Sequence, residues 1–142
     1  MTDSVCVAFI CVENAGRSQM AAAFARIKKE QMDLPIDIKS GGTDPAEAVH
    51  PEVVAAMKER SIDLSEVKPR MISPQELEGC DYVITMGCSA EGVCPVTWQG
   101  TDREWDLRDP GDAELQEVRE IRDEIEFRVA SLMEELFPEQ TT

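Results

Sequence analysis

Basic residues and histidine are scarce in this sequence, and each shortage excludes a class of function. The chain has 14 lysine and arginine residues against 29 aspartate and glutamate residues, so its formal net charge is −15. Nucleic-acid binding depends on basic side chains that meet phosphates, and anionic membranes attract polybasic patches, so we expect neither as a partner. The single histidine, His50, excludes a His-rich metal site and leaves no choice of base for a Cys-His or Ser-His-Asp catalytic group.

Long apolar runs and a secretion signal are missing as well. No apolar stretch approaches the roughly 18–20 residues that a transmembrane helix needs. Residues 1–4 are mostly polar, and the apolar stretch after them is too short for a signal peptide. An odd number of cysteines, five, without a secretion signal does not make a disulfide framework. We therefore expect a cytoplasmic protein with reduced thiols.

The excess of acidic residues has two interpretations. One is an acidic surface suited to high salt, and the other is an ordinary acidic domain. We favour the first, because −15 over 142 residues exceeds the net charge of about 2–8 in magnitude that is common for a small domain.

Length and patterning predict one domain of the α/β class, spanning residues 1–142. The chain is 42% hydrophobic and 30% charged, which is typical of a globular protein. Apolar patterning predicts strands over residues 5–10, 36–40 and 82–86, with weaker ones near 70–72 and 103–106. Helices are predicted over residues 18–30, 51–60, 73–77 and 113–137. This alternation predicts a single-domain sandwich with a mostly parallel, four-stranded central sheet flanked by helices. Ligands in such folds bind beyond the carboxyl ends of strands, here after Ile10 and Met86.

The segment after the first predicted strand carries the most specific chemical signal. Cys11 and Arg17 are separated by five residues, and the candidate oxyanion-binding loop is Val12, Glu13, Asn14, Ala15, Gly16, Arg17 and Ser18. A short loop between a strand and a helix can turn its N–H groups inward to bind an anion, which the helix N-terminus also favours. Arg17 can hold two oxygens of a tetrahedral oxyanion, and the N–H groups favour the thiolate of Cys11. We therefore predict a nucleophilic thiolate beneath a phosphate-like anion.

The other polar residues of the loop have supporting roles in this hypothesis. Asn14 can fix the loop through side-chain hydrogen bonds to its backbone, and Ser18 can donate to the Cys11 sulfur. Glu13 is expected to point to solvent, because the loop offers its backbone inward. Cys6 lies inside the apolar run and is expected in the core.

Residues 5–18, followed by Gln19-Met20-Ala21, resemble the low-molecular-weight protein tyrosine phosphatases and the arsenate reductases that share their fold. The resemblance extends over nearly the whole chain, through Ser40-Gly41-Gly42-Thr43, His50-Pro51 and Asp109-Pro110. Gly16 departs from it, since many relatives have a second cysteine there. His50 is expected to order the entry to its helix or to lie on the surface.

Asp109 meets a chemical need of the predicted site. An oxygen that leaves the tetrahedral centre must be protonated, and a carboxylic acid on a nearby loop can act as the general acid. The resemblance implies that the mobile Asp-Pro loop supplies this acid as Asp109. Asp106 and Asp112 are close enough in sequence to remain alternatives.

A second pair of cysteines favours a reductase. Cys88 follows the strand over 82–86, and Cys94 comes after five more residues. The resemblance to arsenate reductases implies that Cys11 attacks arsenate, that Cys88 then attacks the Cys11 sulfur as arsenite leaves, and that Cys94 attacks Cys88. A thioredoxin-like protein or a low-molecular-weight thiol then reduces the Cys88–Cys94 disulfide, with no metal or organic cofactor.

Helix geometry constrains the last exchange. Positions six apart on a helix differ by about 9 Å in rise, whereas a disulfide needs Cα atoms about 4.4–6.8 Å apart. We therefore expect residues 88–94 to form a loop or a helix that unwinds. Two alternatives remain open: Cys88 resolves alone with a small thiol, or Cys80 is the resolving cysteine.

Three other functions also remain open. One is a phosphatase for phosphotyrosine or small phosphate esters that uses Cys11, Arg17 and Asp109. Another is an oxyanion-binding redox sensor. The third is a metal site built from the three cysteines after position 79, which is disfavoured because their spacing lacks a Cys-x-x-Cys pair.

Overall fold

A four-stranded, wholly parallel sheet forms the centre of the computed structural model, which describes residues 4–87, 98–111 and 113–141. Its strands are β1 (Val5–Cys11), β2 (Ile36–Gly42), β3 (Tyr82–Met86) and β4 (Thr101–Glu104), in the order β2-β1-β3-β4. The predicted sheet is thus confirmed, but the structure differs from the two weaker strand predictions. The segment near 70–72 forms only an isolated bridge from Met71 to Gly42, and β4 lies at 101–104 instead of 103–106. As an edge strand that is exposed on both faces, β4 lacks the alternation from which a strand is predicted.

Five helices complete the described fold. They are α1 (Arg17–Met32), α2 (Pro51–Lys58), α3 (Pro74–Leu77), α4 (Leu115–Leu136) and α5 (Pro138–Thr141). Each lies within a few residues of its predicted range, except α5, which the sequence did not predict as a separate element. Helix α3 begins at a reciprocal capping box that Ser73 and Glu76 form. Within the described residues, no helix is both long enough and apolar enough to span a bilayer.

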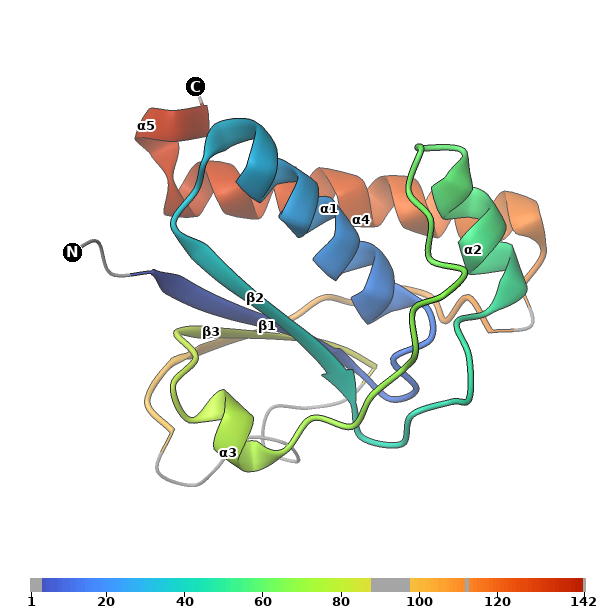
Figure 1. Cartoon of the computed structure of the whole chain (residues 1–142), viewed down its shortest axis with the longest axis horizontal. Coiled ribbons are helices and arrows are strands. Elements are labelled where there is room, and N and C mark those ends of the chain that lie inside the picture. Colours follow the sequence, from blue (N-terminus) through green and yellow to red (C-terminus); the bar gives the residue numbers. More distant parts are fainter. Residues whose placement is uncertain (1–3, 88–97, 112, 142) are drawn as a thin grey trace.

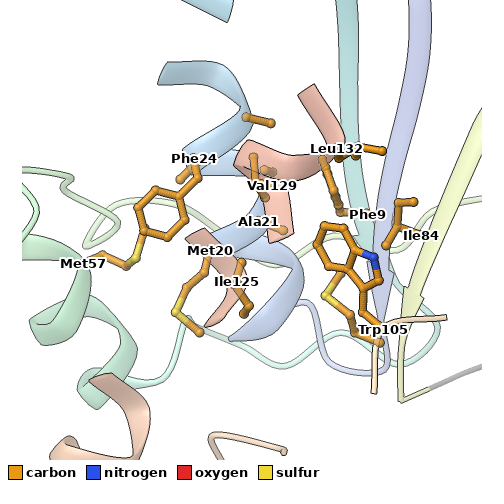
Figure 2. Packing of buried hydrophobic residues seen from close by; sticks show 14 of the residues in the cluster. Phe9, Met20, Ala21, Phe24, Met57, Ile84, Trp105, Ile125, Val129 and Leu132 are labelled. Atoms are coloured by element: carbon orange, nitrogen blue, oxygen red, sulfur yellow. The ribbon is translucent and has the colours of Figure 1, made fainter. Parts of the chain in front are cut away.

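The sheet separates two apolar layers of unequal size. Helices α1, α2, α4 and α5 lie on one side of the sheet, and the short α3 lies on the other (Figure 1). The larger cluster lies beneath α1 and α4, where Phe9 packs against Trp105 with ring centroids 5.8 Å apart (Figure 2). The smaller cluster, under α3, contains Cys6 and Cys80.

Alternation along β1 decides which layer each of its cysteines joins. Successive side chains of a strand point to opposite faces, so residues five positions apart, such as Cys6 and Cys11, face opposite layers. Cys11 belongs to the cluster beneath α1, and Cys6 is core on the other face, as predicted. The carboxyl end of β1 lies between two neighbouring strands, with Cys11 in register with Gly42 of β2 and Met86 of β3. This edge of the sheet, where the strand order reverses, is where α/β folds bind ligands.

Candidate active site

The Cys11 sulfur lies in a polar cradle at the end of β1. The residue is 3% exposed, and its Sγ lies 2.9 Å from the hydroxyl oxygen of Ser18. The backbone N–H of Asn14 donates to the same sulfur at 3.2 Å. The sulfur thus has a backbone N–H donor and a hydroxyl group within hydrogen-bond distance.

The backbone of the loop over residues 11–18, here called the oxyanion loop, presents its N–H groups inward. The carbonyls of Val12, Glu13 and Ala15 accept hydrogen bonds at 2.8–3.0 Å from the N–H groups of Asp44, Ala46 and His50. In a trans peptide, the carbonyl and the following N–H point in opposite directions. Three N–H groups of the loop therefore face the interior, and the N–H of Asn14 on Cys11 is one of them. Inward N–H groups beside a helix N-terminus are the arrangement that suits an anion.

Asn14 holds the loop in this shape from within the protein. It is fully buried and has a left-handed backbone with φ of 53°, which asparagine tolerates better than most residues. Its Oδ1 accepts from the Arg70 backbone N–H and from Gln19 Nε2, both at 3.0 Å, and its Nδ2 donates to the Ser18 hydroxyl at 2.7 Å. The predicted bonds to the backbone of its own loop are not among these, because the partners are the Arg70 backbone and the side chains of Gln19 and Ser18. Since Ser18 accepts from the amide, its own hydroxyl hydrogen is available to the Cys11 sulfur.

Arg17 is the first residue of α1 and reaches across the site. Its side chain is 9% exposed, its Nη1 donates to the Leu107 carbonyl at 3.1 Å, and its Nη2 lies 3.7 Å from Asp109 Oδ2. Gly87, directly after β3, makes room for this guanidinium, because a β-carbon there would lie 2.8 Å from Nη2. Gly87 also has φ of 84°, where side chains are strained. The sequence analysis missed Gly87 as a site residue, although a glycine at a strand end was a signal of close approach.

A cavity of about 450 Å³ opens above the Cys11 sulfur. It is lined by Cys11, Val12, Glu13, Ala15, Gly16, Arg17, His50, Gly87, Leu107, Asp109 and Pro110. Among the candidate acids, Asp109 lines this cavity and Asp106 does not, while Asp112 lies outside the described residues. The Asp109 side chain is 65% exposed, and its Oδ1 accepts the Gly111 N–H at 2.8 Å. The geometry therefore favours Asp109 over Asp106 as the acid.

Glu13 points out of the oxyanion loop and is half exposed, as expected. Its Oε2 lies 3.4 Å from His50 Nε2, which the sequence did not predict. His50 itself is the N-cap of α2, and its backbone N–H bonds the Ala15 carbonyl, so it orders both the helix entry and the loop.

The second pair of cysteines, Cys88 and Cys94, lies outside the described residues. The predicted loop or unwinding helix between them falls on the same residues. The described chain reaches the cavity at Gly87, whose next neighbour in the sequence is Cys88. Among residues 4–87, 98–111 and 113–141, no three His, Cys, Asp or Glu side chains gather as a metal site.

Cys80 lies on the opposite face of the sheet from the cavity. It is 4% exposed within the apolar cluster under α3. Burial, reinforced by the neighbouring Cys6, raises the pKa of the Cys80 thiol to about 12. The structure therefore does not bring Cys80 together with Cys11, and this disfavours Cys80 as the resolving cysteine.

Comparisons with known proteins agree with this geometry. A family model described as low molecular weight phosphotyrosine protein phosphatase matches residues 6–141. The chain is 50% identical over 133 residues to a Halobacterium salinarum protein whose name assigns it provisionally as an arsenate reductase, and the match covers 92% of each chain. It is 33% identical over 135 residues to an arsenate reductase of Brevibacillus brevis, which covers 94% of this chain and 98% of the relative.

Solved structures show the same fold. A thioredoxin-dependent arsenate reductase of Corynebacterium glutamicum superposes with a TM-score of 0.77 at 32% identity. That match covers 98% of this chain, which spans only 65% of the length of the Corynebacterium chain. A low molecular weight protein tyrosine phosphatase of T. tengcongensis superposes with a TM-score of 0.83 at 25% identity, covering 93% of this chain and 99% of that one.

Proposed function

The chain belongs to the low molecular weight phosphotyrosine protein phosphatase family, and we propose that within this family it is an arsenate reductase that works by a cysteine relay. The Cys11 cavity binds arsenate, with phosphate as its analogue, because both are tetrahedral oxyanions that suit a nest of N–H groups. The relatives that are 50% and 33% identical over more than nine-tenths of the chain are named as arsenate reductases, which supports this activity.

One structural observation carries the proposal: the chain reaches the edge of the Cys11 cavity at Gly87, the residue that precedes Cys88 in the sequence. Met86 is the register partner of Cys11, and Gly87 lines the cavity. Cys88 follows Gly87 directly in the sequence. A phosphatase needs one cysteine and water, whereas a reductase needs a thiol that can reach the first sulfur.

The first step forms a bond between sulfur and arsenic. The Cys11 thiolate attacks arsenic(V), which is held by the oxyanion loop and Arg17. One oxygen leaves as water after Asp109 donates a proton to it. Cys11 then carries a thioarsenate ester, and no electrons have yet been transferred.

The second step transfers two electrons. The Cys88 thiolate attacks the Cys11 sulfur, the sulfur–arsenic bond breaks, and its electron pair stays with arsenic, which leaves as arsenite. Cys94 then attacks Cys88, which frees Cys11 and leaves a Cys88–Cys94 disulfide. Two thiols are thus oxidised for each arsenate that is reduced.

An external dithiol must restore the two thiols before the next turnover. A thioredoxin-like protein is the reductant that we propose, by analogy with the Corynebacterium protein, which is named thioredoxin-dependent. A low-molecular-weight thiol is the alternative reductant.

Hydrolysis of phosphate esters is a second candidate activity, favoured by the position of Asp109. Its carboxylate lies 3.7 Å from Arg17 at the cavity that holds Cys11, so nucleophile, anion clamp and acid are already together. These three residues suffice for a cysteine phosphatase, and we expect residual phosphatase activity beside arsenate reduction.

Arsenite production in the presence of thioredoxin, thioredoxin reductase and NADPH tests the proposed function. We expect the wild type to turn over arsenate. We expect Cys88→Ser to lose that turnover, because the thiol that attacks the Cys11 sulfur is then missing. Cys80→Ala is the matched control, since it removes a buried thiol on the other face of the sheet, and it should retain the wild-type rate within about twofold. Absence of arsenite from every protein, together with rapid hydrolysis of phosphate esters, would establish the phosphatase instead.

A further inference from the structure

The loop that carries Asp109 packs directly on the bare backbone of Gly16. A β-carbon at position 16 would lie 2.5 Å from Pro110 Cγ and 3.5 Å from Pro110 Cδ. A carbon–carbon contact is most favourable at about 3.5–4.0 Å, so no side chain fits between these two residues. The proline ring is closed on its own backbone at both ends, so a displacement of Cγ beyond a change of ring pucker carries the backbone of the loop with it.

The His50 ring forms the second wall of this contact. Its Cδ2 would lie 3.6 Å from a β-carbon at Gly16, and its Nε2 would lie 3.5 Å from one at Gly111. The ring therefore fills the space between the oxyanion loop and the loop over residues 107–111, here called the acid loop. The backbone N–H of His50 fixes the ring to the oxyanion loop through the Ala15 carbonyl at 3.0 Å.

We propose that Gly16 is a positioning residue for the general acid: its missing side chain, with the His50 ring beside it, seats Pro110 so that Asp109 lies over the Cys11 cavity. Asp109 is two-thirds exposed, and within its own loop it contacts the Gly111 N–H. Among the described residues, the structure records Arg17 and the Gly111 N–H as partners of this carboxylate, so we expect its position to depend on the packing of Pro110. The proposal deepens the proposed function, because it concerns how the same site delivers its proton.

Gly16→Ala tests this seat, with Gly79→Ala as the matched control. Position 79 has open space around its missing side chain, so an added methyl group there should change neither measurement below. The first measurement is hydrogen exchange of the peptide that contains the acid loop, which needs no activity. We expect faster exchange in Gly16→Ala than in the wild type. Equal exchange in the two proteins would overturn the proposal.

The second measurement compares aryl phosphates whose leaving groups differ in basicity. A poor leaving group such as phenolate needs the acid, and a good one such as dinitrophenolate does not. We expect Gly16→Ala to lose at least about tenfold in kcat/KM on phenyl phosphate and less than about twofold on dinitrophenyl phosphate, and we expect the same pattern for Asp109→Asn. The inhibition constant of inorganic phosphate should stay within about twofold, because alanine keeps the backbone N–H at position 16 and Arg17 is untouched.

A double variant separates loss of the contact between Gly16 and Pro110 from general damage to the oxyanion loop. Pro110→Ala removes both ring atoms that would meet the new methyl group. In the Pro110→Ala background, Gly16→Ala should lower the activity on phenyl phosphate only slightly further, so the effects of the two substitutions should not add. A uniform loss on both esters, a weaker phosphate inhibition or additive effects would contradict the proposal. If the wild type turns over neither arsenate nor aryl phosphates, the proposed function fails. The exchange measurement alone then decides whether Gly16 positions Pro110.

Discussion

Cys11 and Cys80 are both buried thiols, but they lie on opposite faces of the sheet and in different environments. Their exposures are 3% and 4%, so burial does not distinguish them. Cys11 receives the Asn14 N–H and faces the Ser18 hydroxyl, whereas Cys80 lies in an apolar cluster with its sulfur 3.9 Å from the Glu76 carbonyl oxygen. The structure thus records hydrogen-bond donors that point at the Cys11 sulfur, and among the described residues it records none that point at the Cys80 sulfur. Reactivity here follows from the groups that point at the sulfur.

The environment of Cys11 requires polar side chains to be buried. Asn14, Ser18 and Gln19 are at most 3% exposed, and burial of such groups is unfavourable unless they are hydrogen-bonded. Within the described residues, no fully buried side-chain nitrogen or oxygen lacks a partner. The cradle therefore tolerates burial because each of its members bonds the next, and loss of one member exposes the others to the full cost of desolvation.

The largest expected effect separates the two thiols by function. Cys11→Ser should lower arsenate turnover by at least about 10³-fold, because a serine hydroxyl does not supply the thiolate nucleophile. Cys80→Ala should keep turnover within about twofold. Steady-state arsenite production by the two variants at equal concentration provides the measurement. A large loss of arsenate turnover in a natively folded Cys80→Ala protein would contradict the functional difference between the two thiols.

Alkylation rates sharpen the comparison without turnover. With iodoacetamide at pH 9, a thiol with a pKa of about 12 is about 0.1% ionised, so Cys80 in the folded protein should react several hundredfold more slowly than a free thiol. Cys11 should react faster than Cys80, and phosphate should protect Cys11 alone. Peptide mass spectrometry over a time course resolves the sites. Equal rates at the two sites in the folded protein would refute the contrast.

Asn14→Ala measures how strongly the polar cradle depends on one residue. It leaves the Arg70 N–H and the Gln19 amide without their acceptor, so we expect about 2–4 kcal/mol of lost stability. Cys80→Ala removes one sulfur from an apolar cluster and should cost about 1–2 kcal/mol. Urea unfolding monitored by circular dichroism gives both values. A smaller loss for Asn14→Ala than for Cys80→Ala would contradict the account of the cradle.

The smallest effect is on stability at alkaline pH. Because burial holds the folded pKa of Cys80 at about 12, the unfolded chain releases this proton first, near its ordinary value of 9.0. The contribution of Cys80 to the free energy of unfolding is thus complete below pH 9 and falls as the pH rises from 9 toward 12. The stability difference between wild type and Cys80→Ala should narrow over that range. A difference that stays constant would show that Cys80 is not shielded from ionisation.

Local determinants explain which parts of this account the sequence predicts. The oxyanion loop is predictable because Cys11, Arg17 and the strand–loop–helix context lie within one short segment. The opposite orientation of Cys6 and Cys11 also follows from the two-residue repeat of a strand.

Contacts between distant segments explain what the sequence does not predict. Asn14 bonds the backbone of Arg70, 56 positions away, and Arg17 bonds the carbonyl of Leu107, 90 positions away. Neither pairing leaves a periodic signal in the sequence. The same holds for Gly16 under Pro110, since a glycine in a loop does not reveal what packs on it.

A single turnover without any reductant tests the central claim most directly. Arsenate is mixed with the fully reduced protein, and arsenite, free thiols and disulfide-linked peptides are measured after quenching. The relay predicts one arsenite for each chain, the loss of two thiols and a Cys88–Cys94 disulfide, with a Cys11–Cys88 disulfide trapped in Cys94→Ser. An unchanged thiol count with no arsenite, from a protein that still binds arsenate at Cys11, would contradict the reductase account.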